Sequence, residues 1–162
     1  ILIQNNVKNA LINIGGNILA FGKHGKRNWI VGIQNPRRPN ALATINLRPG
    51  WAIGTSGDYQ RFIMVNNQRY SHLINPKTGY PENKTQSATI LIPPSENSGV
   101  LSDVFSKPLF IANTKNKINM AKLLNIEYFL IIMDDGSILI SESFNKKINW
   151  EEDLDKKNIT IF

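Results

Sequence analysis

Two histidines and two groups of polar side chains are the residues of this sequence best suited to chemistry. Histidine is the side-chain type that ordinarily changes charge near neutral pH, and the chain has His24 and His72. His24 lies among basic residues, which is typical of a solvated loop. His72 precedes a segment with Pro and Gly, at the expected end of a strand, where a side chain is held firmly but stays accessible. Position alone favours a hydrogen-bonded strand histidine.

Residues 55–58 combine two hydroxyls, a glycine and a carboxylate directly after an expected strand. A turn of this composition can present backbone N–H groups to a phosphate. Turns built from Ser, Gly and Asp are also common without any ligand. Arg61 and Arg69 follow on the next expected hairpin and would bring positive charge close to a bound phosphate.

Asp103 interrupts an apolar helical pattern in residues 98–112. A carboxylate in such a segment lies at the solvent boundary or is held by a cation. Lys107 comes one helical turn later, which is the favourable order and spacing for an ion pair of about 0.2–0.5 kcal/mol. Spacing alone therefore favours a simple ion pair.

The elements that must position these residues are mostly strands. Short apolar stretches bounded by turn residues predict them at residues 9–14, 17–21, 29–33, 41–47, 51–54, 59–65, 68–74, 85–92, 127–133 and 137–141. Asn66 and Asn67 tolerate positive φ, so they predict a two-residue hairpin turn. The sequence thus predicts a sheet built largely from hairpins.

Two late helices are predicted, at residues 98–112 and 116–124. The first should be bent or interrupted near Lys107, because Pro108 does not fit a helix interior. We expect residues 142–162 to pack as an edge appendage. Strands followed by helices predict an α+β fold with a mixed or antiparallel sheet, without a βαβ repeat.

Composition narrows the classes of function. The 162 residues fit one domain of ordinary size, and 41% hydrophobic against 19% charged residues indicates a globular chain. The lack of cysteine excludes disulfides and thiolate nucleophiles. The longest apolar run is far shorter than the ~18 residues of a membrane-spanning helix. The net charge of +7 suits an anionic partner, but without a nucleic-acid-binding signature we expect no nucleic acid partner.

Three stretches together resemble the carboxy-terminal half of the ApbE-type FAD:protein FMN transferases. They are residues 10–22 (ALINIGGNILAFG), residues 55–81, which include TSGDYQRF and YSHLINPKTGYP, and residues 101–110 (LSDVFSKPLF). The resemblance implies a T-fold-like α+β architecture in which residues 1–162 form a single domain or the carboxy-terminal half of one. It also implies an amino-terminal half, with a Gly-Lys-Gly motif, before Ile1.

The resemblance implies an Mg²⁺-dependent enzyme that cleaves FAD and attaches FMN to a Thr or Ser of a target protein, with release of AMP. The alternatives are an FAD pyrophosphatase that gives FMN and AMP, and a degenerate flavin-nucleotide-binding module without turnover. The expected partners are FAD, the flavinylated target protein and the missing amino-terminal half. An extracytoplasmic location is expected, periplasmic or at the cell surface, with a lipid anchor on the missing amino terminus.

The same resemblance assigns roles to individual residues. It makes His72 and Asp103 catalytic and makes Asp103 the metal ligand. The residues it assigns to the flavin nucleotide are Ser56, Arg61, His72 and Thr78. The family's metal-binding Thr is Lys107 in this chain. A charged ammonium cannot ligate Mg²⁺, so Lys107 either replaces the metal or accompanies it beside the phosphates.

Overall fold

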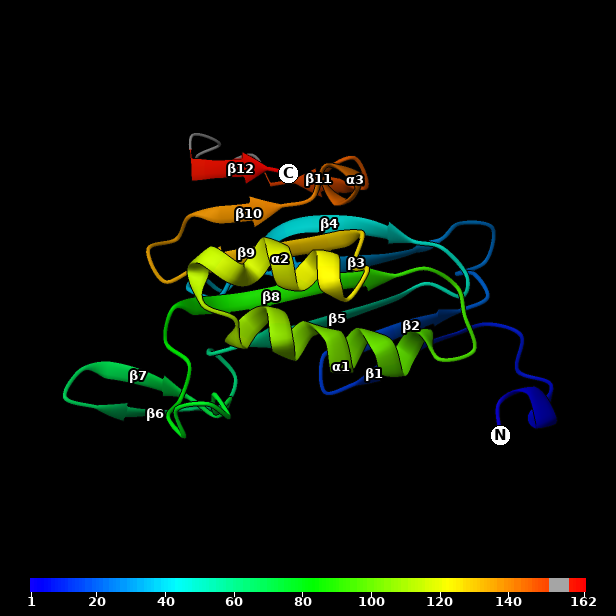
Figure 1. Cartoon of the computed structure of the whole chain (residues 1–162). Helices are drawn as coiled ribbons and strands as arrows, with labels where there is room; N and C mark the ends of the chain where they lie inside the picture. Colours follow the sequence, from blue (N-terminus) through cyan, green and yellow to red (C-terminus); the bar gives the residue numbers. More distant parts are fainter. Residues whose placement is uncertain (152–157) are drawn as a thin grey trace.

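A seven-stranded sheet forms the centre of the molecule (Figure 1). The computed structural model describes residues 1–151 and 158–162. In spatial order the strands are β1 (Ala10–Ile14), β2 (Asn17–Phe21), β5 (Ala52–Gly57), β8 (Thr85–Ile92), β9 (Tyr128–Met133), β10 (Ile138–Ile140) and β12 (Ile159–Ile161). Neighbours are antiparallel except β10 and β12, which are parallel. The prediction of an α+β fold with a mixed sheet is confirmed.

A second sheet and a separate hairpin complete the strands. The antiparallel three-stranded sheet has the order β11 (Ile148–Trp150), β4 (Ala41–Leu47), β3 (Trp29–Gln34). The hairpin of β6 (Phe62–Val65) and β7 (Gln68–Ser71) projects from the body of the molecule (Figure 1). Its turn residues Asn66 and Asn67 have φ of 49° and 61°, which confirms the predicted two-residue turn.

Within residues 1–151 and 158–162, three α-helices follow β8: α1 (Ser98–Ile111), α2 (Lys117–Leu123) and α3 (Glu142–Asn145). Single 3₁₀ turns lie at Ile3–Asn5 and Thr114–Asn116. The expected interruption near Lys107 was wrong, because α1 runs through Pro108 to its last turn. Leu109 and Phe110 are fully buried there, and their packing holds helical geometry although Pro108 has no N–H to donate.

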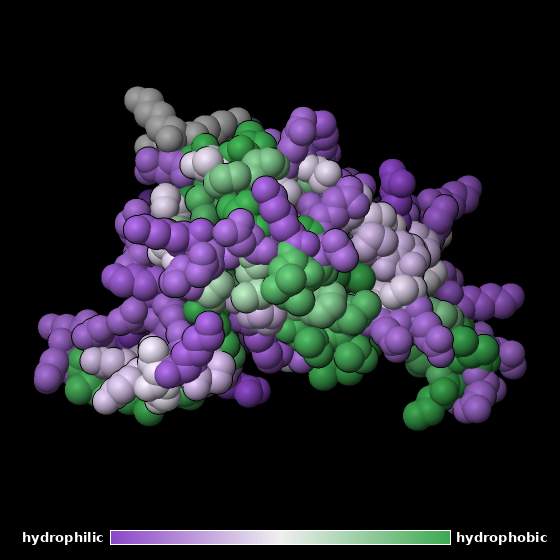
Figure 2. Space-filling view, in the orientation of Figure 1, coloured by the Kyte–Doolittle hydropathy of each residue, from purple (hydrophilic) through white to green (hydrophobic). Residues whose placement is uncertain are grey.

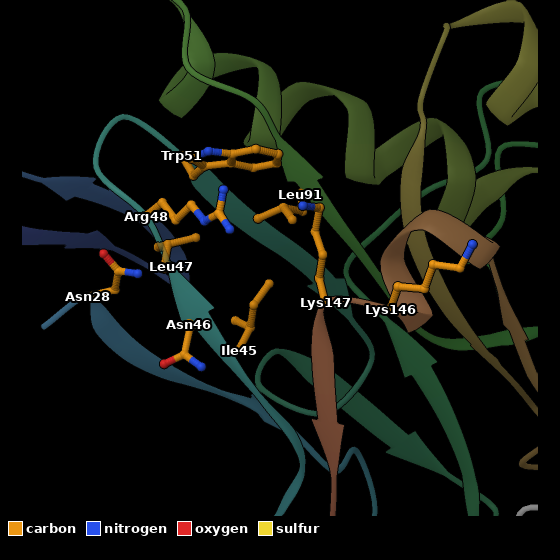
Figure 3. A pocket seen from close by; sticks show the side chains of 9 residues that line it. All are labelled: Asn28, Ile45, Asn46, Leu47, Arg48, Trp51, Leu91, Lys146 and Lys147. Carbon is orange, nitrogen blue, oxygen red and sulfur yellow. The ribbon is translucent and has the colours of Figure 1, made fainter.

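Helices and strands cover opposite faces of the large sheet, so it contributes to two cores. The strand β8 is buried along its whole length. Its Ile90 packs with the residues of α1 and α2, whereas Leu91 packs with those of the three-stranded sheet. The layer between the two sheets has an opening lined by Trp51 and Lys147 (Figure 3). The outer face of α1 also carries apolar surface (Figure 2), with Val100 63% exposed.

Two further expectations were wrong, one about a turn at the site and one about the role of the last residues in the core. Residues 55–57 do not form a turn, because β5 continues to Gly57 as far as its partner strand β8 allows. Residues 142–162 are not just an edge appendage. Phe144 is fully buried in the core and β11 completes the second sheet, although β12 does lie at an edge. Residues 152–157 of that segment lie outside the described residues.

Within the described part of the chain, no helix combines the length and the apolar composition needed to cross a membrane.

Candidate active site

Four of the five predicted site residues line one cavity of about 360 Å³. They are Ser56 on β5, Arg61 before β6, His72 directly after β7, and Asp103 on α1. Thr78 is not part of this lining. It lies in the loop that follows, where its Oγ1 accepts a hydrogen bond from the Tyr80 backbone N–H at 3.2 Å. The fold therefore brings together residues that are far apart in the sequence, and leaves Thr78 outside.

Asp103 and Lys107 form the ion pair that their spacing predicts. Lys107 Nζ lies 2.6 Å from Asp103 Oδ1 and 3.0 Å from the Asp103 backbone oxygen. Asn17, at the start of β2, donates from Nδ2 to the same Oδ1 at 2.6 Å. The hydrogen bond from Lys107 holds the pKa of Asp103 below its usual value, with Asn17 acting in the same direction. The carboxylate is thus ionised and oriented by two elements.

Small side chains let α1 lie close enough to β5 to place this pair in the cavity. Ser102 and Ser106 are buried on the sheet-facing side of α1. Ser106 Oγ hydrogen-bonds Ser56 Oγ at 2.8 Å. A Cβ added to Gly54 would collide with the Ser102 backbone oxygen and the Asn17 side chain. Ser56 lines the cavity, but its hydroxyl also fixes the helix to the sheet.

His72 is oriented by the backbone of Arg61. The His72 backbone N–H donates to the Arg61 carbonyl at 3.2 Å, and His72 Nδ1 lies 3.0 Å from the same oxygen. A carbonyl only accepts hydrogen bonds, so Nδ1 carries the proton. In the neutral ring Nε2 then has a free lone pair and can accept a proton or a hydrogen bond from a bound group.

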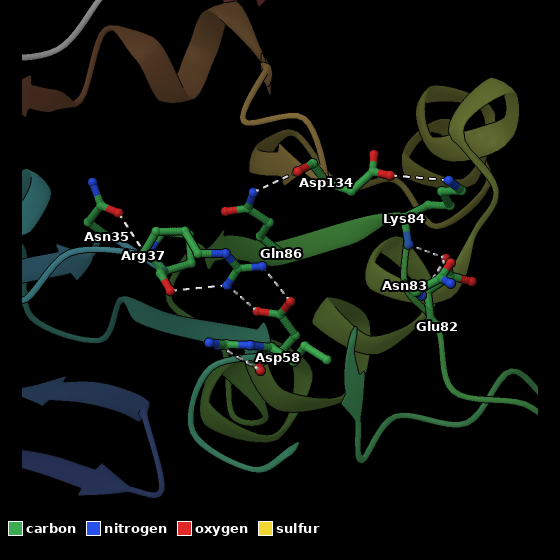
Figure 4. A network of polar contacts seen from close by, with 10 residues as sticks. Asn35, Arg37, Asp58, Glu82, Asn83, Lys84, Gln86 and Asp134 are labelled. Atoms are coloured by element: carbon green, nitrogen blue, oxygen red, sulfur yellow. Dashed lines mark hydrogen bonds and ion pairs between the residues drawn. The ribbon is translucent and has the colours of Figure 1, made fainter. Parts of the chain in front are cut away.

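The segment after β5 is held by a bidentate ion pair rather than by a ligand. Arg37 donates from Nη1 and Nη2 to the two carboxylate oxygens of Asp58 at 2.7 and 2.6 Å (Figure 4). Arg69 Nη1 adds a longer contact of 3.4 Å to the Asp58 backbone oxygen. Because its carboxylate is committed in this way, Asp58 stabilises the shape of the segment that leads to Arg61.

Among the polar residues that line the cavity, sequence reasoning gave no individual role to Asn17 or Tyr59. Both lie inside the motifs GGN and TSGDY, so their neighbours were the available signal. Burial raises the pKa of Tyr59, and the charge of Asp58 adds to that rise. The phenol therefore stays protonated at neutral pH and can donate a hydrogen bond.

The cavity offers limited ligands for a metal ion. Within the described ranges, no three His, Asp or Glu side chains are grouped to hold one. Asp103 Oδ1 accepts from both Lys107 and Asn17, whereas Oδ2 accepts from neither. Mg²⁺ is often bound by one or two carboxylates together with substrate phosphates and water. Asp103 fits such a site as its single carboxylate ligand.

Comparison with known proteins identifies the family of this chain. The model of the ApbE family matches residues 1–130. The chain belongs to the ApbE family. This confirms the resemblance of the three motif-bearing stretches.

Curated relatives of this ApbE-family chain include two proteins named FAD:protein FMN transferase. The one from Rhodobacter capsulatus is 32% identical over 146 residues, which cover 90% of this chain and 27% of the relative. The one from Haemophilus influenzae is 34% identical over 156 residues, which cover 91% of this chain and 43% of the relative. The chain thus spans less than half the length of these relatives.

Solved structures agree with the fold. The ApbE protein from Thermotoga maritima has a TM-score of 0.75 and 30% identity, over 86% of this chain and 44% of that one. The flavin transferase ApbE from Vibrio cholerae has a TM-score of 0.69 and 28% identity, over 90% of this chain and 46% of that one.

Proposed function

We propose that this ApbE-family chain provides part of the site that transfers FMN from FAD to a Thr or Ser hydroxyl of a target protein. The names of its relatives support FMN transfer from FAD as the reaction. The observation that carries the proposal for this chain is the convergence of His72, Arg61, Asp103 and Lys107 on one cavity. These side chains combine a proton acceptor, two cations and a carboxylate.

The two cations suit the substrate. The pyrophosphate of FAD carries two negative charges. Arg61 forms no salt bridge with a described residue and offers a positive charge in a partly enclosed cavity, where such attraction is stronger than in open water. Lys107 adds an ammonium donor whose charge is partly offset by Asp103. Fixed cations that meet the charge of a transferring phosphoryl group lower its barrier without reorganisation. Asp103 and Asn17 position Lys107 for this role.

The chemical step follows from the same arrangement. The hydroxyl oxygen of the target forms a bond to the phosphorus of the FMN half. The bond from that phosphorus to the bridging oxygen breaks, and AMP leaves with this oxygen. His72 Nε2 accepts the hydroxyl proton, which is the usual contribution of a positioned histidine to such a transfer.

We also propose that Mg²⁺ binds through Asp103 Oδ2 when FAD is present. When bound, the ion offsets negative charge on the pyrophosphate and on the departing AMP. Lys107 then accompanies the ion beside the phosphates and does not replace it. The single carboxylate makes binding of the ion depend on the phosphates of the substrate.

The test is an incubation of the protein with FAD and Mg²⁺, with and without a protein extract of its source. The proposal expects a flavin-fluorescent band on a denaturing gel, and AMP release that rises with the extract. Release of FMN and AMP in equal amounts without the extract would instead identify an FAD pyrophosphatase. Binding of FAD without any release of AMP would identify a module without turnover.

An extracytoplasmic location is also proposed, and it rests on the family resemblance alone. Fractionation of source cells followed by immunoblotting tests it. Recovery of the protein with cytoplasmic marker enzymes would contradict it.

A further inference from the structure

A second cavity, of about 380 Å³, opens between the two sheets (Figure 3). It lies at the start of β5, whereas the candidate active site lies at the end of that strand. Its inner wall is apolar and contains Ile45, Leu47 and Leu91, all three buried in the core between the sheets. The proposed FMN transfer makes no use of this cavity.

The charge of this second cavity is positive. Arg48, Lys146 and Lys147 line it, and no acidic side chain of the described residues does. Lys146 is neutralised by Glu142, whose Oε1 lies 2.7 Å from its Nζ, and it points away from the opening (Figure 3). Arg48 and Lys147 form no salt bridge with any described residue. With respect to the part of the chain that the structure describes, Arg48 and Lys147 are therefore two uncompensated cations that can attract an anion.

Aromatic rings hold one of these cations and offer a planar surface. Lys147 Nζ lies 4.8 Å from the ring centre of Trp51 and 5.2 Å from that of Tyr128. The two rings pack edge to face at 5.4 Å. Such cation–π contacts keep an ammonium in place without neutralising its charge. Lys147 is therefore positioned before any ligand arrives.

The remaining residues that border the cavity are Asn28 and Asn46. Asn46 lies between the buried Ile45 and Leu47 on β4, so its carboxamide points away from the opening (Figure 3). Asn28 can donate and accept hydrogen bonds, as the edge of a nucleobase requires. A guanidinium and an ammonium suit a phosphate group, and an indole suits a planar ring. The volume lies within the range of about 300–1,000 Å³ that is usual for small-molecule sites.

We propose that this cavity binds a nucleoside monophosphate or a ligand of that chemistry, with its phosphate between Arg48 and Lys147 and its planar ring against Trp51. The site is distinct from the flavin-nucleotide cavity, because the two lie at opposite ends of β5. The proposal does not depend on FMN transfer.

The experiment is an isothermal titration of the protein with AMP, with adenosine and inorganic phosphate as partial ligands. AMP should bind at least about 10-fold more tightly than either part, because each part lacks one set of contacts. Lys147→Met keeps the apolar stem but removes the charge, and it should weaken AMP binding about 10-fold, as expected for loss of a charge-assisted hydrogen bond. Lys147→Arg should retain most of the affinity.

The adjacent lysine is the matched control. Lys146→Met removes the same charge from a neighbouring residue that is already paired with Glu142, so AMP affinity should stay within about twofold. Equal loss in both variants would reduce the effect to net charge and overturn the proposal. So would AMP binding that is insensitive to Lys147→Met but lost in Lys107→Met, because AMP would then occupy the candidate active site. Phosphate that binds as tightly as AMP would overturn the role of the ring.

Discussion

Lys107 affects how strongly the candidate active site binds cations and anions, because it is paired with the Asp103 carboxylate. Its ammonium lies 2.6 Å from the carboxylate that would otherwise be free to bind a divalent ion. An ammonium next to a carboxylate competes with Mg²⁺ for that carboxylate, but both cations can serve a pyrophosphate when it is bound. Lys107 should therefore make the need for Mg²⁺ weaker than it would be with an oxygen ligand in its place.

The substitution Lys107→Thr tests this directly. It removes the competing ammonium and adds an oxygen ligand, so the affinity for Mg²⁺ with FAD bound should rise about 10-fold, a change of about 1.4 kcal/mol. Calorimetric titration of Mg²⁺ into the FAD complex measures it. Lys107→Met removes the charge without adding an oxygen and separates the two effects. Native protein that binds no Mg²⁺ in the presence of FAD would contradict the proposed metal site at Asp103.

The role of His72 as a proton acceptor can be tested with a substitution that keeps its side-chain hydrogen bond to the Arg61 carbonyl. The side-chain amide of His72→Asn can still donate to the Arg61 carbonyl, but it has no counterpart of the Nε2 lone pair. AMP release should fall about 100-fold, the lower part of the range for general base catalysis. Circular dichroism and thermal melting should stay as in the native protein, because His72 is exposed. Full activity of this variant would leave His72 only a structural role.

Spacing within one helix was enough to predict the pair of Asp103 and Lys107. It could not predict Asn17, because that residue reaches Asp103 only through the packing of α1 on β5. The same limit applies to Asp58. The composition of residues 55–58 is typical of a phosphate-binding turn that includes Asp58. In the structure both carboxylate oxygens of Asp58 accept hydrogen bonds from Arg37, which lies in a distant loop.

At the scale of elements, the close approach of α1 to β5 is what assembles the candidate active site. Gly54 is the contact point, since nothing larger fits against the Ser102 backbone. A displacement of α1 here would move Asp103 and Lys107 away from Asn17. The packing of one glycine therefore controls the geometry of an ion pair on the neighbouring element.

Gly54→Ala should destabilise the protein by about 1–3 kcal/mol, the usual cost of overpacking a filled core. It should also weaken FAD binding. Gly99→Ala is the matched control, because its added methyl has its nearest contact at 3.8 Å, on the Leu19 side chain. Gly99 is the second residue of α1 and has helical geometry, for which Ala has the higher propensity, so that change should be neutral or stabilising. Urea denaturation of both variants measures the difference, and equal stability would contradict the role given to Gly54.

The elements themselves were largely predictable from apolar patterns and turn residues. Strands β4 and β8 have the predicted bounds. The failures came where tertiary contacts overrode local preference: pairing with β8 extended β5 through a Ser-Gly sequence, and core packing carried α1 past Pro108. The short helix α3 and strand β11 were not predicted, because their local sequences show little periodicity. Helix α3 packs against β9 through the buried Phe144, and β11 pairs with β4.

At the scale of the whole molecule, one buried lysine joins α1, α2 and β8. Lys117 is fully buried at the start of α2. Its Nζ lies within 2.7–3.1 Å of Thr85 Oγ1 and of three backbone oxygens at the end of α1, those of Leu109, Phe110 and Ala112. These are carbonyls that a helix end leaves without partners. Burial lowers the pKa of Lys117 to about 8, although the negative charges of Glu82 and Asp134 act to raise this pKa.

Lys117→Met should destabilise the protein, because the Leu109 and Ala112 carbonyls at the end of α1 lose the donor Lys117 at a cost of about 1–3 kcal/mol, whereas the Phe110 carbonyl still accepts from Thr85 Oγ1. The loss of stability caused by Lys117→Met should become larger as the pH rises. Between pH 8 and 10.5 the unfolded lysine holds its proton while the folded one releases it, so the native protein gains stability as pH rises through this window. Below pH 8 both states are protonated and the difference between the two proteins is constant.

The pH dependence of the difference in stability can be measured by urea denaturation of the native protein and of Lys117→Met at pH 7 and pH 10. The difference in unfolding free energy should increase by about 2–3 kcal/mol at the higher pH. Other groups that titrate in this range act on both proteins and cancel. A difference that stays the same at both pH values would contradict the lowered pKa of Lys117.

The pairing of β11 with β4 sets an order of assembly during synthesis of the chain. Ile45 on β4 leaves the ribosome long before its partner Ile148 has been made. Until then, the apolar face of β3 and β4 lacks the strand and the buried Phe144 that complete its layer. Contacts between such distant segments form late and slow folding. The second sheet therefore stays open until almost the whole chain has been made, and its apolar face needs protection from aggregation during that time.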